Sequence, residues 1–345
     1  MQREDGIATK RRYFAAANGI FGFRNYFSRV FDSSAYRRIF VLKGGPGTGK
    51  SSLMKKITRA FPDGAYRTEA IFCSSDPDSL DGVIVEGVGG RVAVLDGTAP
   101  HERDAVIPGA IDELVNLGDA WDAGVLETQR EEILALTKKK SACYADAYRY
   151  LAAFGKTIEY SSAESENCRL GDLRKKIRSL LFDCRGEGGG TSCRLIRGFG
   201  CRGEVLLPTF RVLSERAYLL RGSTPHKARV LAEMLRVFEE DGIPAVVAPS
   251  PLDPRLLDGI LAQTEGISFS AVGEDGIPFD ADEFFAERTC EREGELSLLT
   301  LAKESFASAS EFHFALEDIY KEAMDFRVID EKTEKILERI GSLIG

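Results

Sequence analysis

One stretch of the sequence decides the fold, and it reads Arg38-Ile39-Phe40-Val41-Leu42-Lys43-Gly44-Gly45-Pro46-Gly47-Thr48-Gly49-Lys50-Ser51-Ser52-Leu53. Its apolar run, residues 39–42, predicts a buried strand. The side chains of Leu53, Ile57 and Phe61 recur with the spacing of one helix face, so a helix is predicted to follow. A glycine-rich loop therefore joins a strand to a helix.

This loop has the spacing of a phosphate-binding loop, because four residues separate Gly44 from Gly49-Lys50-Ser51. Glycines let successive N–H groups face inward, and the following helix adds the positive end of its dipole. We expect Lys50 to reach the β- and γ-phosphates of a nucleotide and the Ser51 hydroxyl to hold Mg²⁺. The alternative is an ordinary glycine turn. The predicted binding residues are Gly44, Gly45, Pro46, Gly47, Thr48, Gly49, Lys50, Ser51 and Ser52.

Residues 38–53 resemble the P-loop NTPase superfamily. Two further segments, Cys73-Ser74-Ser75-Asp76-Pro77-Asp78-Ser79-Leu80-Asp81-Gly82 and Leu95-Asp96-Gly97-Thr98-Ala99-Pro100-His101, resemble uncharacterised bacterial ATP-binding proteins built from two P-loop repeats. The resemblance covers most of the chain. It implies ATP binding and names no reaction.

The second half of the sequence repeats the first. Segment 216–222 matches 38–44, and segment 253–259 matches 76–82 after a change of one residue in register. A duplicated unit is predicted, because chance does not hold register in this way. The expected fold class is α/β, with duplicated P-loop NTPase-like three-layer units and appended helical hairpins.

The expected boundary between the repeats is the glycine-rich run 186–190. The N-terminal repeat, with the intact loop, then spans 1–185, and the C-terminal repeat spans 191–345. Two helical stretches between residues 126 and 181 predict a hairpin outside the first sheet. A similar helical segment over 299–343 ends the second repeat.

The second repeat has a damaged loop, which reads Gly222-Ser223-Thr224-Pro225-His226-Lys227-Ala228. His226 replaces the glycine before the lysine, and Ala228 replaces the hydroxyl that would hold Mg²⁺. Pro225 also removes an N–H group that the loop would need. We therefore expect Mg-nucleotide to bind only the first repeat.

Asp96 ends the apolar run 92–95, where P-loop proteins place a second Mg²⁺ ligand. In the second repeat the same register gives Gly273, so the carboxylate is lost together with the functional loop. Asp96 is predicted to hold Mg²⁺ with Ser51 and to act with Lys50 in catalysis. The alternative is a simple Asp-Gly turn.

Features shared by both repeats suit structural roles, whereas features found only in the first suit function. Asp78 and Glu86 are replaced in the second repeat, so both are candidates for positioning water or an acceptor, and Asp78 joins the predicted catalytic set. Asp76 recurs with the proline after it and is interpreted as a helix cap. Asp81 recurs as well and receives the same structural interpretation.

The residue after Asp96 is Gly97, where many P-loop ATPases have a glutamate that activates water. Its absence predicts slow hydrolysis. His101 is close enough in sequence to point into the site, but an isolated loop histidine is expected to be solvated.

The formal net charge of −8 argues against a generally basic surface, so nucleic acid is not indicated as a partner. Seven cysteines without a Cys-x-x-Cys spacing favour a reducing cytoplasm over a zinc site or a disulfide framework. No run is long enough to span a bilayer, so a cytoplasmic protein without membrane contact is expected.

Three functions fit these features. The first is a slow or partner-stimulated Mg-dependent ATPase with one competent site. The second is a P-loop kinase that phosphorylates a small acceptor, and the third is a nucleotide-gated binding module with little turnover. Neither the acceptor, nor a protein partner, nor the choice between ATP and GTP can be deduced from the residues.

Overall fold

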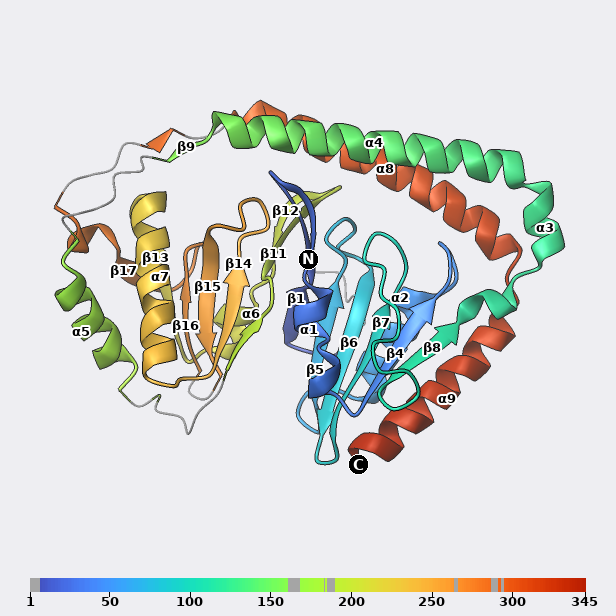
Figure 1. Cartoon of the computed structure of the whole chain (residues 1–345), viewed down its shortest axis with the longest axis horizontal. Coiled ribbons are helices and arrows are strands. Elements are labelled where there is room, and N and C mark those ends of the chain that lie inside the picture. Colours follow the sequence, from blue (N-terminus) through green and yellow to red (C-terminus); the bar gives the residue numbers. More distant parts are fainter. Residues whose placement is uncertain are drawn as a thin grey trace.

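The computed structural model describes residues 7–160, 168–182, 184, 190–263, 266–286, 291–292 and 295–345. Two six-stranded sheets lie side by side, and a pair of long helices runs along both of them (Figure 1). Among the helices of the described residues, none combines the length and the apolar composition that crossing a lipid bilayer requires.

The two sheets have the same topology. The first has the order β1 (Arg11–Phe14), β5 (Arg67–Phe72), β6 (Leu80–Gly87), β7 (Gly90–Asp96), β4 (Arg38–Lys43) and β8 (Asp112–Asn116). The second has the order β10 (Thr191–Cys193), β14 (Ala245–Pro249), β15 (Leu257–Ala262), β16 (Ile267–Ser270), β13 (Arg216–Arg221) and β17 (Ile277–Asp280). In each sheet the third strand is antiparallel to both neighbours and the other pairs are parallel. The predicted duplication is confirmed.

Shorter elements complete the described chain. Three two-stranded pairs are β2 (Ala16–Gly19) with β3 (Gly22–Asn25), β11 (Arg197–Gly200) with β12 (Gly203–Leu206), and β9 (Glu159–Tyr160) with β18 (Glu291–Arg292). The 3₁₀ helices are η1 (Ser33–Ala35), η2 (Leu117–Ala120) and η3 (Asp282–Phe284). The α-helices are α1 (Phe27–Val30), α2 (Lys50–Ala60), α3 (Ala123–Thr128), α4 (Arg130–Thr157), α5 (Leu170–Leu180), α6 (Thr209–Leu213), α7 (Thr224–Glu240), α8 (Leu296–Glu322) and α9 (Phe326–Ile344).

The sequence pattern explains the central elements. The run Ile39–Leu42 is fully buried in β4, because this strand lies between two others inside the sheet. The predicted helix after the glycine loop is α2, and its side chains Leu53, Met54 and Ile57 face the core. The predictions of a strand at 39–42 and a helix from residue 50 are confirmed.

The two halves join at an edge of the first sheet. Phe14 of β1 and Leu195 exchange both backbone hydrogen bonds, at 2.8 and 3.0 Å. Next to them, the guanidinium of Arg194 lies 2.8 Å from the carboxylate of Glu69, and both side chains are buried. Residues from both halves therefore share one hydrophobic core.

The helices are arranged differently from the predicted hairpins. α4 packs along α8 from the other half (Figure 1), whereas α5 lies against α7 and η3 of the second half. α9 packs on β6 and β7 of the first half and ends in its core. The last helix of each predicted repeat, α5 or α9, therefore packs on the other half. The predicted boundaries 1–185 and 191–345 do not separate the packed units. Periodicity reveals an apolar stripe but not its partner.

A second expectation was also wrong. Residues 76–79 form a turn that leads into β6, and no helix follows Asp76. The Asp76 carboxylate accepts hydrogen bonds from the Asp78 N–H at 3.3 Å and the Ser79 hydroxyl at 2.9 Å, so it caps a turn between strands. Residues 186–189 of the predicted linker lie outside the described residues.

Candidate functional site

The glycine loop at 44–49 connects the end of β4 to the start of α2. Gly47 and Gly49 have φ values of 70° and 81°, in the left-handed region that glycine tolerates. A Cβ atom added at Gly44 would lie 2.9 Å from Thr48 Oγ1. The loop conformation therefore depends on glycine at these positions.

Lys50 folds back over this loop. Its Nζ atom donates hydrogen bonds to the carbonyls of Gly44 and Gly45, each at 2.7 Å. The same atom lies 3.6 Å from Asp96 Oδ2, and both side chains are largely buried. The ammonium group is thus held at the loop beside a carboxylate.

Asp96 reaches this position because β7 and β4 are parallel neighbours whose carboxyl ends share one edge of the sheet. Its Oδ1 atom accepts hydrogen bonds from the Thr98 N–H at 2.9 Å and the Thr98 hydroxyl at 2.5 Å. Ser51, in the first turn of α2, accepts a hydrogen bond from the Leu80 N–H at 3.0 Å. Carboxylate and hydroxyl oxygens are ligands that suit Mg²⁺.

The predicted loop residues are therefore gathered around the start of α2 with Lys50 and Asp96. Models of protein families, curated proteins and solved structures gave no match to this chain. The duplicated half supplies an internal comparison for the same loop.

In the second half, a carboxylate fills the corresponding loop. Asp282 Oδ1 accepts a hydrogen bond from the Ser223 N–H at 3.0 Å and lies 2.7 Å from His226 Nδ1. The register of β17 on β13 places Asp282 where the first half has Gly118. Residues from Thr224 onward are already helical, so no open glycine loop forms.

The strand register also corrects one sequence alignment. Val94 pairs with Phe40 in the first sheet, and Phe269 pairs with Tyr218 in the second, so the counterpart of Asp96 is Ala271. The constant offset between the repeats predicts Gly273 instead, because it does not account for the shorter β15–β16 hairpin of the second half. Lys227 Nζ lies 3.5 Å from the backbone carbonyl oxygen of Ala271. Lys50 Nζ, by contrast, lies beside the side-chain carboxylate of Asp96.

The end of α8 covers one side of the glycine loop. A Cβ atom added at Gly47 would lie 2.6 Å from the Glu317 carbonyl oxygen. One added at Gly45 would lie 3.3 Å from the Tyr320 ring and 3.4 Å from the ring of Trp121. These aromatic rings meet edge to face, with centroids 5.7 Å apart. Sequence reasoning missed this contact, because nothing near the loop predicts that a distant helix packs on it.

Asp78 and Glu86 do not join the site. Asp78 lies on an exposed turn and forms an ion pair with Arg202 of the second half. Glu86 lies at the far end of β6 from Leu80, where it pairs with Arg67 at 3.9 Å and Arg91 at 3.5 Å. These ion pairs give no support to their assignment as positioning residues, because a difference between the repeats also arises where one surface ion pair replaces another.

Two residues given structural or solvated roles do approach the site. Asp81 and His101 are both buried, and Asp81 Oδ1 lies 3.6 Å from His101 Nε2. One ligand atom from each, together with one from Asp96, lie within 4.8 Å of one another. His101 is therefore not a solvated loop residue. The signal available in the sequence was its place in the segment after Asp96.

The glutamate missing after Asp96 has a steric explanation. A Cβ atom added at Gly97 would lie 2.4 Å from Val41 Cγ1 and 3.0 Å from the carbonyl oxygen of Arg103. Residue 97 also donates its N–H to the Leu42 carbonyl at 3.0 Å. A water-activating side chain therefore has no room at this position.

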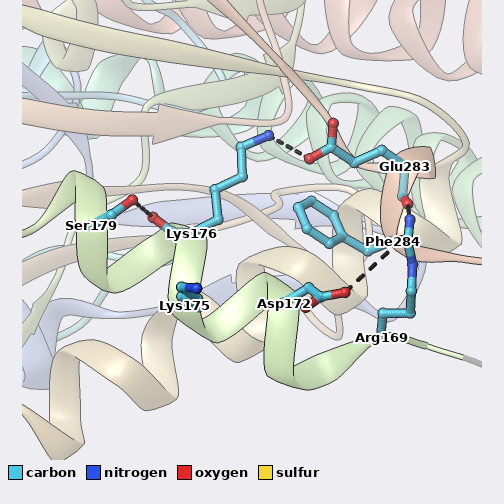
Figure 2. A pocket seen from close by; sticks show the side chains of 7 residues that line it. All are labelled: Arg169, Asp172, Lys175, Lys176, Ser179, Glu283 and Phe284. Carbon is cyan, nitrogen blue, oxygen red and sulfur yellow. Dashed lines mark hydrogen bonds and ion pairs between the residues drawn. The ribbon is translucent and has the colours of Figure 1, made fainter.

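A surface hollow on the second half is a weaker candidate. Charged side chains from α5 and η3 line it, and Lys176 points toward Glu283 (Figure 2). Lys176 pairs with Glu283 and also lies over the Phe284 ring, 5.2 Å from its centroid. Arg169 lies 3.8 Å from Asp172. These groups satisfy one another, so the hollow offers no set of side chains arranged for a ligand.

Proposed function

We propose that the chain is a P-loop nucleotide-binding protein that holds Mg-ATP at the glycine loop 44–51. The observation that carries this proposal is the position of Lys50, whose Nζ atom is fixed at the loop 3.6 Å from Asp96. The loop N–H groups and the start of α2 favour phosphate. Ser51 and Asp96 supply hydroxyl and carboxylate oxygens for Mg²⁺.

The proposal assigns one site to the chain. The second half carries its own carboxylate, Asp282, where a phosphate would lie against the N–H of Ser223. It also has Ala271 in place of a metal-binding carboxylate. An anion there would meet a negative charge and no metal ligand, so the second half is assigned a structural role.

The reaction proposed for the site is slow Mg-dependent ATP hydrolysis, which a partner or acceptor accelerates. Lys50 and the metal ion would stabilise the charge that develops on the phosphates. Gly97 leaves no room for a water-activating glutamate, so water is poorly oriented in the isolated protein. A kinase reaction is the second candidate, because a bound acceptor would hold its hydroxyl in position and would not need a residue that orients water. A binding module that hardly turns over is the third.

Calorimetric titration with Mg-ATP tests the assignment. One binding event per chain is expected, and the Lys50→Ala variant should bind Mg-ATP much more weakly. Two equivalent events would contradict the assignment of a single site. Phosphate release with and without small hydroxyl acceptors then separates hydrolysis from transfer, and a parallel titration with Mg-GTP determines the base preference.

A further inference from the structure

Asp81 lies at an irregular position of β6. Ile71 pairs with Gly82 and Phe72 pairs with Leu80, so Asp81 is the extra residue of a bulge. Bulges redirect side chains and are frequent next to functional sites. The Asp81 side chain is buried, and its Oδ2 atom has no hydrogen-bond partner among the described residues.

His101 is buried against the same carboxylate. Its ring stacks on Phe27 with centroids 4.8 Å apart, so its orientation is fixed by packing. Its Nδ1 atom has no hydrogen-bond partner in the described part of the chain. The separation of 3.6 Å between His101 Nε2 and Asp81 Oδ1 is too long for a hydrogen bond. Both side chains thus carry polar atoms that the protein leaves unsatisfied, which is costly in a buried place.

The surroundings of Asp81 do not neutralise it. Among the described residues no arginine or lysine forms an ion pair with its carboxylate, and one oxygen of Asp96 lies within 4.8 Å of one of its own. A cation between the carboxylates would remove this conflict.

The second half shows how the same bulge is satisfied with an internal cation. Asp258 occupies the equivalent position of β15, between Leu257 and Gly259. It accepts two hydrogen bonds from Arg197, at 2.8 Å from Nε and 2.7 Å from Nη2. The arginine comes from β11 of the β11–β12 hairpin.

The first half has no arginine at the corresponding place. The hairpins align through their closing pairs, Gly19 with Gly22 and Gly200 with Gly203, which puts Ala16 at the position of Arg197. Ala16 is buried and has no charge. The half with the open glycine loop therefore keeps the bulge carboxylate but lacks its guanidinium, and has His101 beside it instead.

We propose that Asp81, Asp96 and His101 bind a divalent transition-metal ion, such as Mn²⁺ or Zn²⁺, which takes the place that Arg197 has in the second half. A mixed set of carboxylate and imidazole ligands suits these ions better than the oxygen-only set preferred by Mg²⁺. With metal–ligand distances of about 2.1 Å, a tetrahedral angle separates two ligand atoms by about 3.4 Å. The observed separation of 3.6 Å between His101 and Asp81 is close to this value. This ion is distinct from the Mg²⁺ that accompanies a nucleotide, and the two ions would share Asp96 as a ligand.

Metal binding by the full-length chain without nucleotide tests the proposal. After removal of bound metal, titration with Mn²⁺ followed by electron paramagnetic resonance should give one site per chain. Pulsed measurements should show coupling to one ¹⁴N nucleus, because the imidazole is a ligand. His101→Asn should remove the nitrogen coupling and weaken Mn²⁺ binding by about 100-fold or more.

A matched control excludes binding by a surface pair. His313 and Glu317 lie one turn apart on α8, with Nε2 3.4 Å from Oε1, and form a rival pair of side chains for a divalent ion. His313→Asn should leave both the affinity and the nitrogen coupling unchanged. Asp81→Asn keeps the shape of the side chain and should weaken binding even if the His101 variant folds poorly.

Two outcomes would overturn the proposal. The first is a metal-free wild-type chain that takes up neither Mn²⁺ nor Zn²⁺ in a stoichiometric amount. The second is binding that survives Asp81→Asn, or that is lost in His313→Asn. Since no nucleotide is present, a failure of ATP binding would not produce either outcome.

Discussion

Lys50 Nζ lies 3.6 Å from Asp96 Oδ2, although one residue begins a helix and the other ends a strand far along the chain. The parallel pairing of β4 with β7 creates this proximity. Only the first half has such a pair of charges, since the second has Lys227 beside the carbonyl of Ala271. Because only the first half pairs its loop lysine with a carboxylate, variants of the two lysines should affect nucleotide binding differently.

Lys50→Ala should weaken Mg-ATP binding by about 30- to 150-fold, because a hydrogen bond from a charged donor contributes about 2–3 kcal/mol. Calorimetry measures this change. Lys227→Ala is the matched control, because that lysine lies in the first turn of α7, beside the loop that Asp282 fills. It should leave the affinity unchanged. Equal losses in the two variants would mean that the second loop also contacts the nucleotide.

Asp96→Asn should reduce Mg-dependent phosphate release by at least about 100-fold, because it removes a metal ligand and the charge that positions Lys50. The rate of phosphate release by the wild type is expected to lie far below the ~1–100 s⁻¹ typical of phosphoryl transfer to a proper acceptor. Asp78→Asn should change the rate by no more than about twofold, since Asp78 is an exposed residue paired with Arg202. Rapid release that survives Asp96→Asn would contradict the metal assignment.

Trp121 should report nucleotide binding through its fluorescence. It is the only tryptophan of the chain, and its ring lies against Gly45 and Tyr320. A ligand at the glycine loop changes the field and the packing around this ring, so emission should change and saturate with the calorimetric dissociation constant. Trp121→Phe should abolish the signal and keep binding. Calorimetric binding by the wild type without any change of emission would place the ligand away from Gly45.

Glu317 should make the packing of α8 on the glycine loop sensitive to acid. Hydrogen bonds from His313 and then Lys321 lower the pKa of its carboxyl from the usual 4.5 to about 2, against the effect of burial. Because the folded pKa is the lower one, this stabilisation is complete above about pH 4.5 and is lost as the pH falls toward 2.

Glu317→Gln should therefore lower the free energy of unfolding at pH 7 by about 1–2 kcal/mol, after a discount for partial exposure of the pair. Urea unfolding of the variant and the wild type between pH 7 and 3.5 measures the difference, which should shrink at the acid end. A difference that stays constant with pH would show that the carboxylate charge is not the cause.

Part of the site follows from local sequence. Glycine at 47 and 49, Lys50, and the strand before them specify a strand–loop–helix unit through contacts between near neighbours. The loss of the phosphate-binding pattern in the second loop also follows from local sequence, because Pro225 and His226 change the local backbone and its N–H donors. The structure adds that Asp282 fills that loop, which depends on the pairing of β17 with β13.

The sequence by itself determined the duplicated α/β units, because strand and helix periodicity and the repeated register are local properties. The tertiary structure alone decided which half each helix covers, since an amphipathic stripe requires burial without naming a partner. It also decided that α8 packs on the glycine loop and that a bulge turns Asp81 toward His101. Sequence comparison of the repeats gave Asp81 a structural role, because the shared aspartate hides the change of its partner from Arg197 to the buried histidine.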